Sequence, residues 1–184
     1  MTMFSNKFNS AVCFVLSQEG GYSNHPNDIG GETNYGISKR FVTANNLKIS
    51  SIKDLTLTQA KLIYYNYFWL PVKAEDINDD KIALMVFDTA VLCGIAKAID
   101  FLQQSITVFT PITVDGIIGQ QTLNAINKII ESDYLKNYII DIYATTRKKY
   151  HIDKTRGNSS QSVFIKGWLN RVNELLKYVP PKTS

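Results

Sequence analysis

Hydrophobic positions along the chain repeat mostly at the three- and four-residue spacing that is typical of α-helices. The first repeat predicts an amphipathic helix over residues 5–18, whose apolar stripe is formed by Phe4, Phe8, Ala11, Val12, Val15 and Leu16. Residues 20–37 break this pattern, because they contain five glycines and a proline. We therefore expect a small glycine-rich loop or hairpin after the first helix.

Helical patterns continue through the rest of the chain. The most apolar segment covers residues 79–93 and ends at Gly94, as expected for the central helix of a helical core. Ser38 and Thr58 are predicted to cap helices, and Pro71 to stop the second of these. The other predicted helices cover about residues 38–45, 58–69, 95–104, 119–126, 132–150 and 160–178. Strand signals are confined to short stretches near 33–37 and 106–114, so the predicted fold class is mainly α.

The composition is that of an ordinary globular protein. The 184 residues are 45% hydrophobic and 20% charged, which excludes a collagen-like, coiled-coil or wholly disordered chain. No apolar run approaches the ~20 residues that a membrane span needs, so no stable membrane insertion is expected. The apolar stretch near the N-terminus lacks the basic flank and cleavage site of a signal peptide. We therefore expect the protein to be made in the cytoplasm without a signal peptide.

Charge is unevenly distributed along the chain. Residues 1–100 carry nine basic and ten acidic side chains, whereas residues 101–184 carry eleven and six, so the net charges are −1 and +5. A basic C-terminal half suits an anionic polymer such as nucleic acid or cell wall, or a membrane surface. A solvated face that aids solubility explains the same charge.

The cysteines and histidines give no sign of a metal site. Cys13 and Cys93 lie in apolar helical contexts and are predicted to be buried free thiols. His25 and His151 lack partners at the spacing of metal ligands. We therefore expect neither a disulfide, a metal nor a cofactor.

Glu19 is the first candidate for chemistry. At 100° per residue it extends the apolar stripe of Phe8, Val12 and Val15, where partial loss of water favours a protonated carboxyl. A carboxyl that keeps its proton near neutrality is what a general acid requires. The Gly20-Gly21 pair would let the chain turn away and leave this carboxyl at the lip of a cleft. The alternative is a glutamate that caps or pairs at a helix end.

Asp28 and Thr33 follow Glu19 within the glycine-rich loop. A loop that folds back would place Asp28 across a groove from Glu19, and two carboxyls that admit a water between them make an inverting glycosidase. In this interpretation Glu19 protonates the leaving oxygen, Asp28 activates water, and the Thr33 hydroxyl holds that water. Asp28 is also explained by an ordinary turn before Gly30-Gly31.

This stretch resembles a known family. Its block E-G-G-Y…P-x-D-x-G-G-x-T-N-Y-G-I, over residues 19–37, looks like the motif of glycoside hydrolase family 108, the N-acetylmuramidases, some first described as secretion activator proteins. The resemblance implies a lysozyme-like α fold and cleavage of the β-1,4 bond between N-acetylmuramic acid and N-acetylglucosamine. It also implies that Glu19 is the catalytic glutamate. Glu19, Asp28 and Thr33 are similar in order to the Glu/Asp/Thr trio of phage-type lysozymes.

Three residues that flank the candidate acid and base are predicted to contact substrate. They are Tyr22, Asn34 and Tyr35.

Later motifs continue the resemblance. Residues 60–69 and 87–90 look like the family's A-x-x-I-Y and F-D-x-A segments. Residues 114–123 and 167–171 resemble the D-G-x-x-G-x-x-T and G-W-x-x-R motifs of a C-terminal region predicted to bind peptidoglycan. The predicted organisation is a lysozyme-like catalytic region over 1–93 and a peptidoglycan-binding helical region over 94–184, packed as one globule.

Several other residues have a structural explanation from the sequence alone. The aromatic side chains at 64–69 pair at helical spacing and are expected mainly in the core, although aromatic faces also stack on sugars. Asp88 lies in the most apolar helix and must be hydrogen-bonded or paired. Trp168 is expected in the core, with wall contact as the alternative, and Asp115-Gly116 is expected to form a turn.

The leading hypothesis is a peptidoglycan hydrolase without a cofactor, acting in the periplasm or cell wall after release through a holin. Its setting would be phage-like lysis, as an endolysin, or holin-assisted secretion. A lytic transglycosylase is an alternative, but Asp28 and Thr33 suit a reaction that uses water. A non-catalytic wall-binding secretion accessory is another. A nucleic-acid-binding protein is disfavoured, because the basic residues are dispersed.

Overall fold

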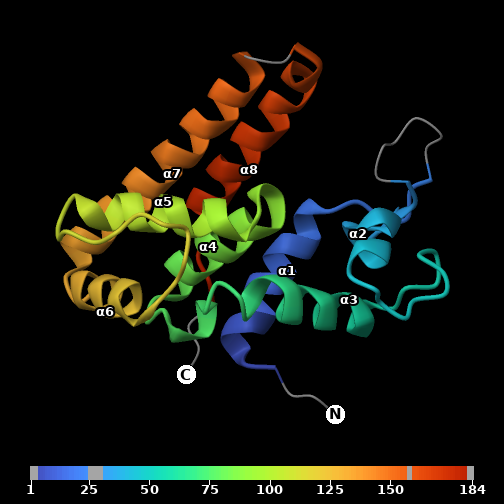
Figure 1. The fold of residues 1–184 in the computed structure, drawn as a ribbon, viewed down its shortest axis with the longest axis horizontal. Coiled ribbons are helices and arrows are strands. Elements are labelled where there is room, and N and C mark those ends of the chain that lie inside the picture. Colours follow the sequence, from blue (N-terminus) through green and yellow to red (C-terminus); the bar gives the residue numbers. More distant parts are fainter. Residues whose placement is uncertain (1–3, 25–30, 157–158, 182–184) are drawn as a thin grey trace. The chain divides into compact units, whose positions relative to one another are not determined.

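The computed structural model describes residues 4–24, 31–156 and 159–181. Within these residues the chain forms eight α-helices and one two-stranded sheet, so the prediction of a mainly α fold is confirmed (Figure 1). The N-terminal elements are α1 (Asn6–Gln18), β1 (Thr33–Asn34), β2 (Ile37–Ser38), α2 (Lys39–Ala44) and α3 (Leu57–Tyr64). The later α-helices are α4 (Asp80–Cys93), α5 (Ile95–Thr107), α6 (Gln120–Ile129), α7 (Asp133–Arg156) and α8 (Ile165–Lys177).

The chain divides into two compact units. The first extends to Tyr67 and the second begins at Phe68. The predicted boundary between residues 93 and 94, and the predicted packing of the two regions as one globule, stay predictions.

The first unit is organised around α1. Ser5 caps this helix by accepting a hydrogen bond from the Phe8 backbone N–H. Four positions of the predicted apolar stripe are buried, Phe8, Ala11, Val12 and Val15, and its two end positions are half-buried. The ring of Tyr65 packs edge-on against Phe8, with 5.0 Å between centroids. Cys13 is exposed, which contradicts the prediction of a buried thiol, because it lies off the apolar stripe.

The aromatic segment after α3 differs locally from its prediction. Thr56, rather than Thr58, caps α3, and Gln59 completes a capping box with it. A π-helical turn, Tyr65–Trp69, follows α3 and takes the chain to Pro71. The predicted core packing is confirmed for Tyr64 and Trp69, which are almost fully buried, whereas the three aromatic side chains between them are half-buried.

In the second unit, α4 is the central helix, as predicted. Every residue from Ile82 to Ala90 is buried, and the positive φ of Gly94 (+91°) separates α4 from α5. Helix α5 packs on α4 and α7, and α7 lies beside α8 (Figure 1). The predicted strand near 106–114 is wrong: α5 continues to Thr107, and the β-branched residues that follow pair with no strand in the described chain.

The turn at Asp115-Gly116 is confirmed, and Gln103 holds it. This buried amide of α5 accepts hydrogen bonds from both backbone N–H groups of the turn, at 3.0 and 2.9 Å. Its amide nitrogen donates to the Asp115 carboxylate at 2.8 Å. An added Cβ at Gly116 (φ +70°) would lie 3.0 Å from Asp100. These contacts explain why the D-G-x-x-G motif has Asp at position 115 and Gly at position 116.

Asp88 is the buried charge that joins three helices of this unit. Its carboxylate, which is fully buried in α4, pairs with Arg147 of α7 at 2.7 Å and with Arg171 of α8 at 2.8 Å. Burial raises the pKa of Asp88, but the two guanidinium groups outweigh it and hold this pKa below its ordinary value. The prediction that Asp88 must be paired is thus confirmed, and the role of Asp88 is to hold the three helices together.

Cys93 of α4 and His151 of α7 lie next to each other in the same unit. The Cys93 thiol is half-buried, and its Sγ lies 3.9 Å from Nε2 of His151, which is 58 positions away in the sequence. Burial raises the pKa of Cys93, which disfavours a reactive thiolate. Burial, Arg147 and Lys154 lower the pKa of His151 to about 4, so this imidazole is neutral in the folded protein at neutral pH.

Replacing Asp88 by Asn should lower the free energy of unfolding by about 3–5 kcal/mol, because two buried guanidinium groups lose their counter-charge. Asp133→Asn is the matched control, since Asp133 is 91% exposed and pairs with Lys136 at the surface. It should change stability by less than about 1 kcal/mol. Urea unfolding of both variants measures the difference, and equal losses would contradict the role of Asp88.

Stability should fall as the pH is lowered from 7 to 5, because the unfolded state then takes up a proton at residue 151 that the folded state excludes. The folded pKa of His151, about 4, lies below the ordinary value of ~6.5, which gives a loss of about 2 kcal/mol over this interval. Urea unfolding at the two pH values measures it, with His151→Phe as comparison. Between pH 7 and pH 5, the His151→Phe variant should lose less free energy of unfolding than the unaltered protein, by about 2 kcal/mol. If both proteins lose the same amount, the lowered pKa of His151 is refuted.

Candidate active site

Glu19 lies where α1 ends. Its backbone is extended (φ −95°, ψ 146°), and its N–H donates to the Leu16 carbonyl at 3.3 Å, which closes the last turn of the helix. The side chain is half-buried, and it follows the buried positions Val12 and Val15. The sequence prediction that Glu19 continues the apolar stripe agrees with this placement.

The predicted hairpin is present in the glycine-rich segment. Strands β1 and β2 are antiparallel, with Thr33 opposite Ser38 and Asn34 opposite Ile37. The two residues between the strands, Tyr35 and Gly36, both have positive φ, at +50° and +74°. Positive φ at both central residues is the type I′ geometry that matches the twist of a two-residue hairpin.

The hairpin turn lies directly against Glu19. A Cβ added at Gly36 would lie 2.7 Å from Cγ and 2.8 Å from Cδ of Glu19, and 2.6 Å from the hydroxyl oxygen of Tyr64. Only glycine provides both the positive φ and this close approach. The end of α1, the hairpin turn and the end of α3 therefore meet at the Glu19 carboxyl.

Tyr64 fixes the turn from the other side. Its hydroxyl donates to the Tyr35 carbonyl at 2.8 Å, and its side chain is only 1% exposed. This bond holds Tyr35 in the positive-φ conformation, which is unfavourable for a residue with a side chain. Sequence analysis placed Tyr64 in the core and missed its position beside Glu19, because nothing in the spacing of residues 19, 36 and 64 indicates that they meet.

The remaining candidates for catalysis are Asp28 and Thr33. Asp28 lies outside the described residues, so its role as a base stays a prediction. Thr33 is half-buried, and its backbone pairs with Ser23 through hydrogen bonds of 2.8 and 2.9 Å. Its hydroxyl donates to the Gly31 carbonyl at 3.3 Å. The predicted role of Thr33 in holding a water also stays a prediction.

The predicted substrate contacts differ in their surroundings. Asn34 is buried, and its amide nitrogen donates to the carbonyls of Ile52 and Lys53, at 3.0 and 3.2 Å, which ties the hairpin to the following loop. Tyr35 is half-buried. Tyr22 is 41% exposed, which leaves it accessible to a ligand. Substrate contact by these three residues stays a prediction.

A carboxylate that sequence analysis did not select lies on the same hairpin. Glu32 accepts a hydrogen bond from the Tyr22 hydroxyl at 3.0 Å and pairs with Lys39 at 3.4 Å. The hydrogen bond to Glu32 raises the pKa of Tyr22. Glu32 thus orients the exposed ring of Tyr22 near the hairpin whose turn packs on Glu19.

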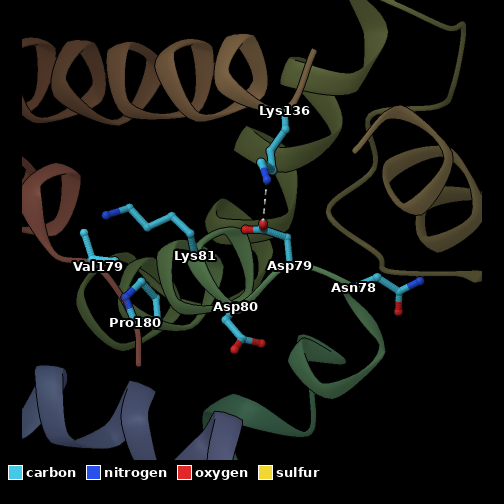
Figure 2. Close-up of a pocket in the computed structure, with 7 residues that line it drawn as sticks. All are labelled: Asn78, Asp79, Asp80, Lys81, Lys136, Val179 and Pro180. Atoms are coloured by element: carbon cyan, nitrogen blue, oxygen red, sulfur yellow. Dashed lines mark ion pairs between the residues drawn. The ribbon is translucent and has the colours of Figure 1, made fainter. Parts of the chain in front are cut away.

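A hollow in the second unit is lined mainly by charged side chains (Figure 2). Its volume is about 570 Å³, and Asn78, Asp79, Asp80, Lys81, Lys136, Val179 and Pro180 line it. Asp79 caps α4 and pairs with Lys136 at 3.6 Å. Lys81 donates to carbonyls at the end of α8, including that of Leu176 at 3.0 Å. These charges stabilise helix ends.

The described chain shows neither a cluster of metal ligands nor a membrane-spanning helix. Its His, Cys, Asp and Glu side chains form no group of three that suits a metal ion. None of its helices combines the length and apolar composition needed to cross a bilayer.

Comparisons with known protein families and solved structures give matches over both halves of the chain. The model of the family Glycosyl hydrolase 108 matches residues 12–94, which contain Glu19, the hairpin and Tyr64. A solved structure, SagA of Brucella abortus, is similar at 32% identity with a TM-score of 0.70, over 92% of this chain and 91% of that chain. The chain belongs to glycosyl hydrolase family 108. No curated protein matches it.

The second half of this family 108 protein carries its own match. The family described as Predicted Peptidoglycan domain matches residues 97–173. Together the two matches make the protein a glycoside hydrolase that acts on peptidoglycan. The lysozyme-like helical fold expected from the sequence is confirmed.

Gly36→Ala should displace Glu19 and Tyr64, and we expect it to lower peptidoglycan hydrolysis at least tenfold. Gly94→Ala is the control, because Gly94 also has positive φ (+91°) but nothing lies within 4 Å of an added Cβ. Both variants should lose about 1–3 kcal/mol from backbone strain. Turbidity loss of cell walls measures hydrolysis, and equal activity of the two variants would contradict the close approach at Gly36.

Proposed function

We propose that this protein is an N-acetylmuramidase that hydrolyses the β-1,4 bond between N-acetylmuramic acid and N-acetylglucosamine, with inversion at the anomeric carbon. The observation that carries the proposal is the half-buried Glu19 side chain, which packs on the hairpin turn at Gly36, where the Tyr64 hydroxyl also lies. A carboxyl fixed by packing on a glycine has the defined position that proton transfer needs.

Glu19 acts as the general acid in this proposal. The Tyr64 hydroxyl donates to the Tyr35 carbonyl and so fixes the turn that packs on Glu19. As the general acid, Glu19 enters the reaction carrying its proton. Glu19 then gives this proton to the glycosidic oxygen as the C–O bond breaks, and the leaving sugar departs as an alcohol.

Asp28 and Thr33 complete the reaction as proposed from the sequence. Asp28 removes a proton from a water that attacks the anomeric carbon from the opposite face, and Thr33 holds this water. The water supplies the new anomeric hydroxyl, and its proton passes to Asp28. Tyr22, Asn34 and Tyr35 would contact the neighbouring sugars.

The proposed place of action is the periplasm or cell wall, because peptidoglycan lies there. Release through a holin would bring the enzyme to its polymer, either in phage-like lysis or in secretion.

Glu19→Gln should lower hydrolysis of purified peptidoglycan by about 10²–10⁴-fold, because the amide cannot supply the proton. Mass spectrometry of the released fragments should show reducing N-acetylmuramic acid ends with the unaltered protein. Glu131→Gln, which changes an exposed carboxylate paired with Lys128, is the control and should keep full activity.

The same measurement separates the alternatives. Fragments with 1,6-anhydro ends would overturn the hydrolytic role of water and make the protein a lytic transglycosylase. Equal activity of Glu19→Gln and the unaltered protein would remove Glu19 from catalysis. No fragments from folded protein on several wall types would favour a wall-binding accessory protein.

A further inference from the structure

A stack of aromatic rings leads from the interior of the α7–α8 pair to its surface. His151 of α7 is 2% exposed, and its ring stacks on Trp168 of α8 with 5.0 Å between centroids and 27° between planes. Phe164 lies one helical turn before Trp168 and stacks on it at 5.9 Å and 29°. Phe164 is 54% exposed, so the stack ends in an aromatic ring that water reaches.

A cation accompanies this stack. The ammonium group of Lys154 lies 5.1 Å from the centroid of Trp168. Its neighbours Lys149 and Arg156 both pair with Asp153, at the surface of α7. Lys154 has no acidic partner among the described residues, so its charge is available to an anionic ligand.

We propose that Phe164, Trp168 and Lys154, here called the α8 platform, bind the glycan strand of peptidoglycan outside the active site. A sugar ring stacks on the exposed face of Phe164. The Lys154 ammonium pairs with a carboxylate of the lactyl or peptide substituent that N-acetylmuramic acid carries.

The chemistry of both partners supports this assignment. The C–H face of a pyranose packs on a flat aromatic ring, and the stack behind Phe164 holds this ring in place. Peptidoglycan carries its carboxylates beside the sugar, which matches a cation placed beside an aromatic ring. The α8 platform also lies within residues 97–173, the part matched by the Predicted Peptidoglycan domain. The identity of the polymer rests on the proposed function.

An anionic membrane is the competing partner for the same surface, because Val163 is 75% exposed beside Phe164. We favour the glycan since the rings are stacked and the cation lies over a ring. The two partners make different demands on residue 164: a sugar needs a flat face, whereas a lipid surface needs only apolar area.

Binding is measured with full-length Glu19→Gln protein, which leaves the polymer intact, by cosedimentation with purified peptidoglycan. Adding Phe164→Ala or Phe164→Leu should weaken binding about tenfold, which corresponds to about 1.4 kcal/mol. Phe164→Tyr should bind normally, because it keeps the flat ring. Tyr134→Ala is the control: Tyr134 is 67% exposed in the same matched region, and its ring meets Tyr138 in an edge-on pair.

Lys154→Gln tests the cation with two soluble probes. Binding of a muramyl-peptide disaccharide should weaken about two- to fivefold and lose its salt dependence. Binding of chito-oligosaccharide, which has no carboxylate, should not change. Lys128→Gln, which removes an exposed lysine already paired with Glu131, is the control.

Each result supports or overturns the α8 platform. Unchanged binding by a folded Phe164→Ala variant, as judged by circular dichroism and thermal midpoint, would overturn it. Equal binding by Phe164→Leu, together with cosedimentation with vesicles containing phosphatidylglycerol, would assign the surface to a membrane instead. Hydrolysis by the unaltered protein is scored separately, so failure of the α8 platform and failure of the muramidase proposal are distinguishable.

Discussion

The second unit depends on one buried charge. Asp88 belongs to α4, the most apolar of the described helices, where an unpaired carboxylate would be strongly destabilising. One arginine from α7 and one from α8 pair with this carboxylate. Because those arginines lie far along the chain, this contact brings the C-terminal helices to α4. The same pairing sets the position of α8, and with it the aromatic stack that reaches the surface through Phe164.

A comparable constraint governs the first unit, but it is steric rather than electrostatic. Gly36 is in contact with the side chain of Glu19, so the hairpin turn and the end of α1 cannot move independently. Tyr64 secures the turn by its hydrogen bond to Tyr35. The glycine at this turn thus helps to position the Glu19 carboxyl, because it allows the backbone to approach that carboxyl as closely as another side chain would.

Two motifs of the second half have separate physical roles. The D-G-x-x-G segment is a turn whose N–H groups are held by Gln103, which explains Asp115 and Gly116 without a ligand. In the G-W-x-x-R segment, Arg171 points into the core while Trp168 is half-buried and belongs to the stack of His151 and Phe164. A buried ion pair and a half-buried aromatic stack therefore lie within one turn of α8.

The sequence by itself determined the helical class, the central position of residues 79–93, the need for a partner at Asp88, and Glu19 as the candidate acid. These follow from local periodicity and from the free energy of burying charge, which depend on nearby residues alone. Helix limits were less accurate, as Thr56 and the longer α5 show, because packing extends or replaces local signals. Only the tertiary structure decided that Tyr64 lies beside Glu19, that Arg147 and Arg171 share Asp88, and that His151, Trp168 and Phe164 form a stack. Each of these contacts joins residues on different elements, and their distance in space depends on how helices pack rather than on their spacing along the chain.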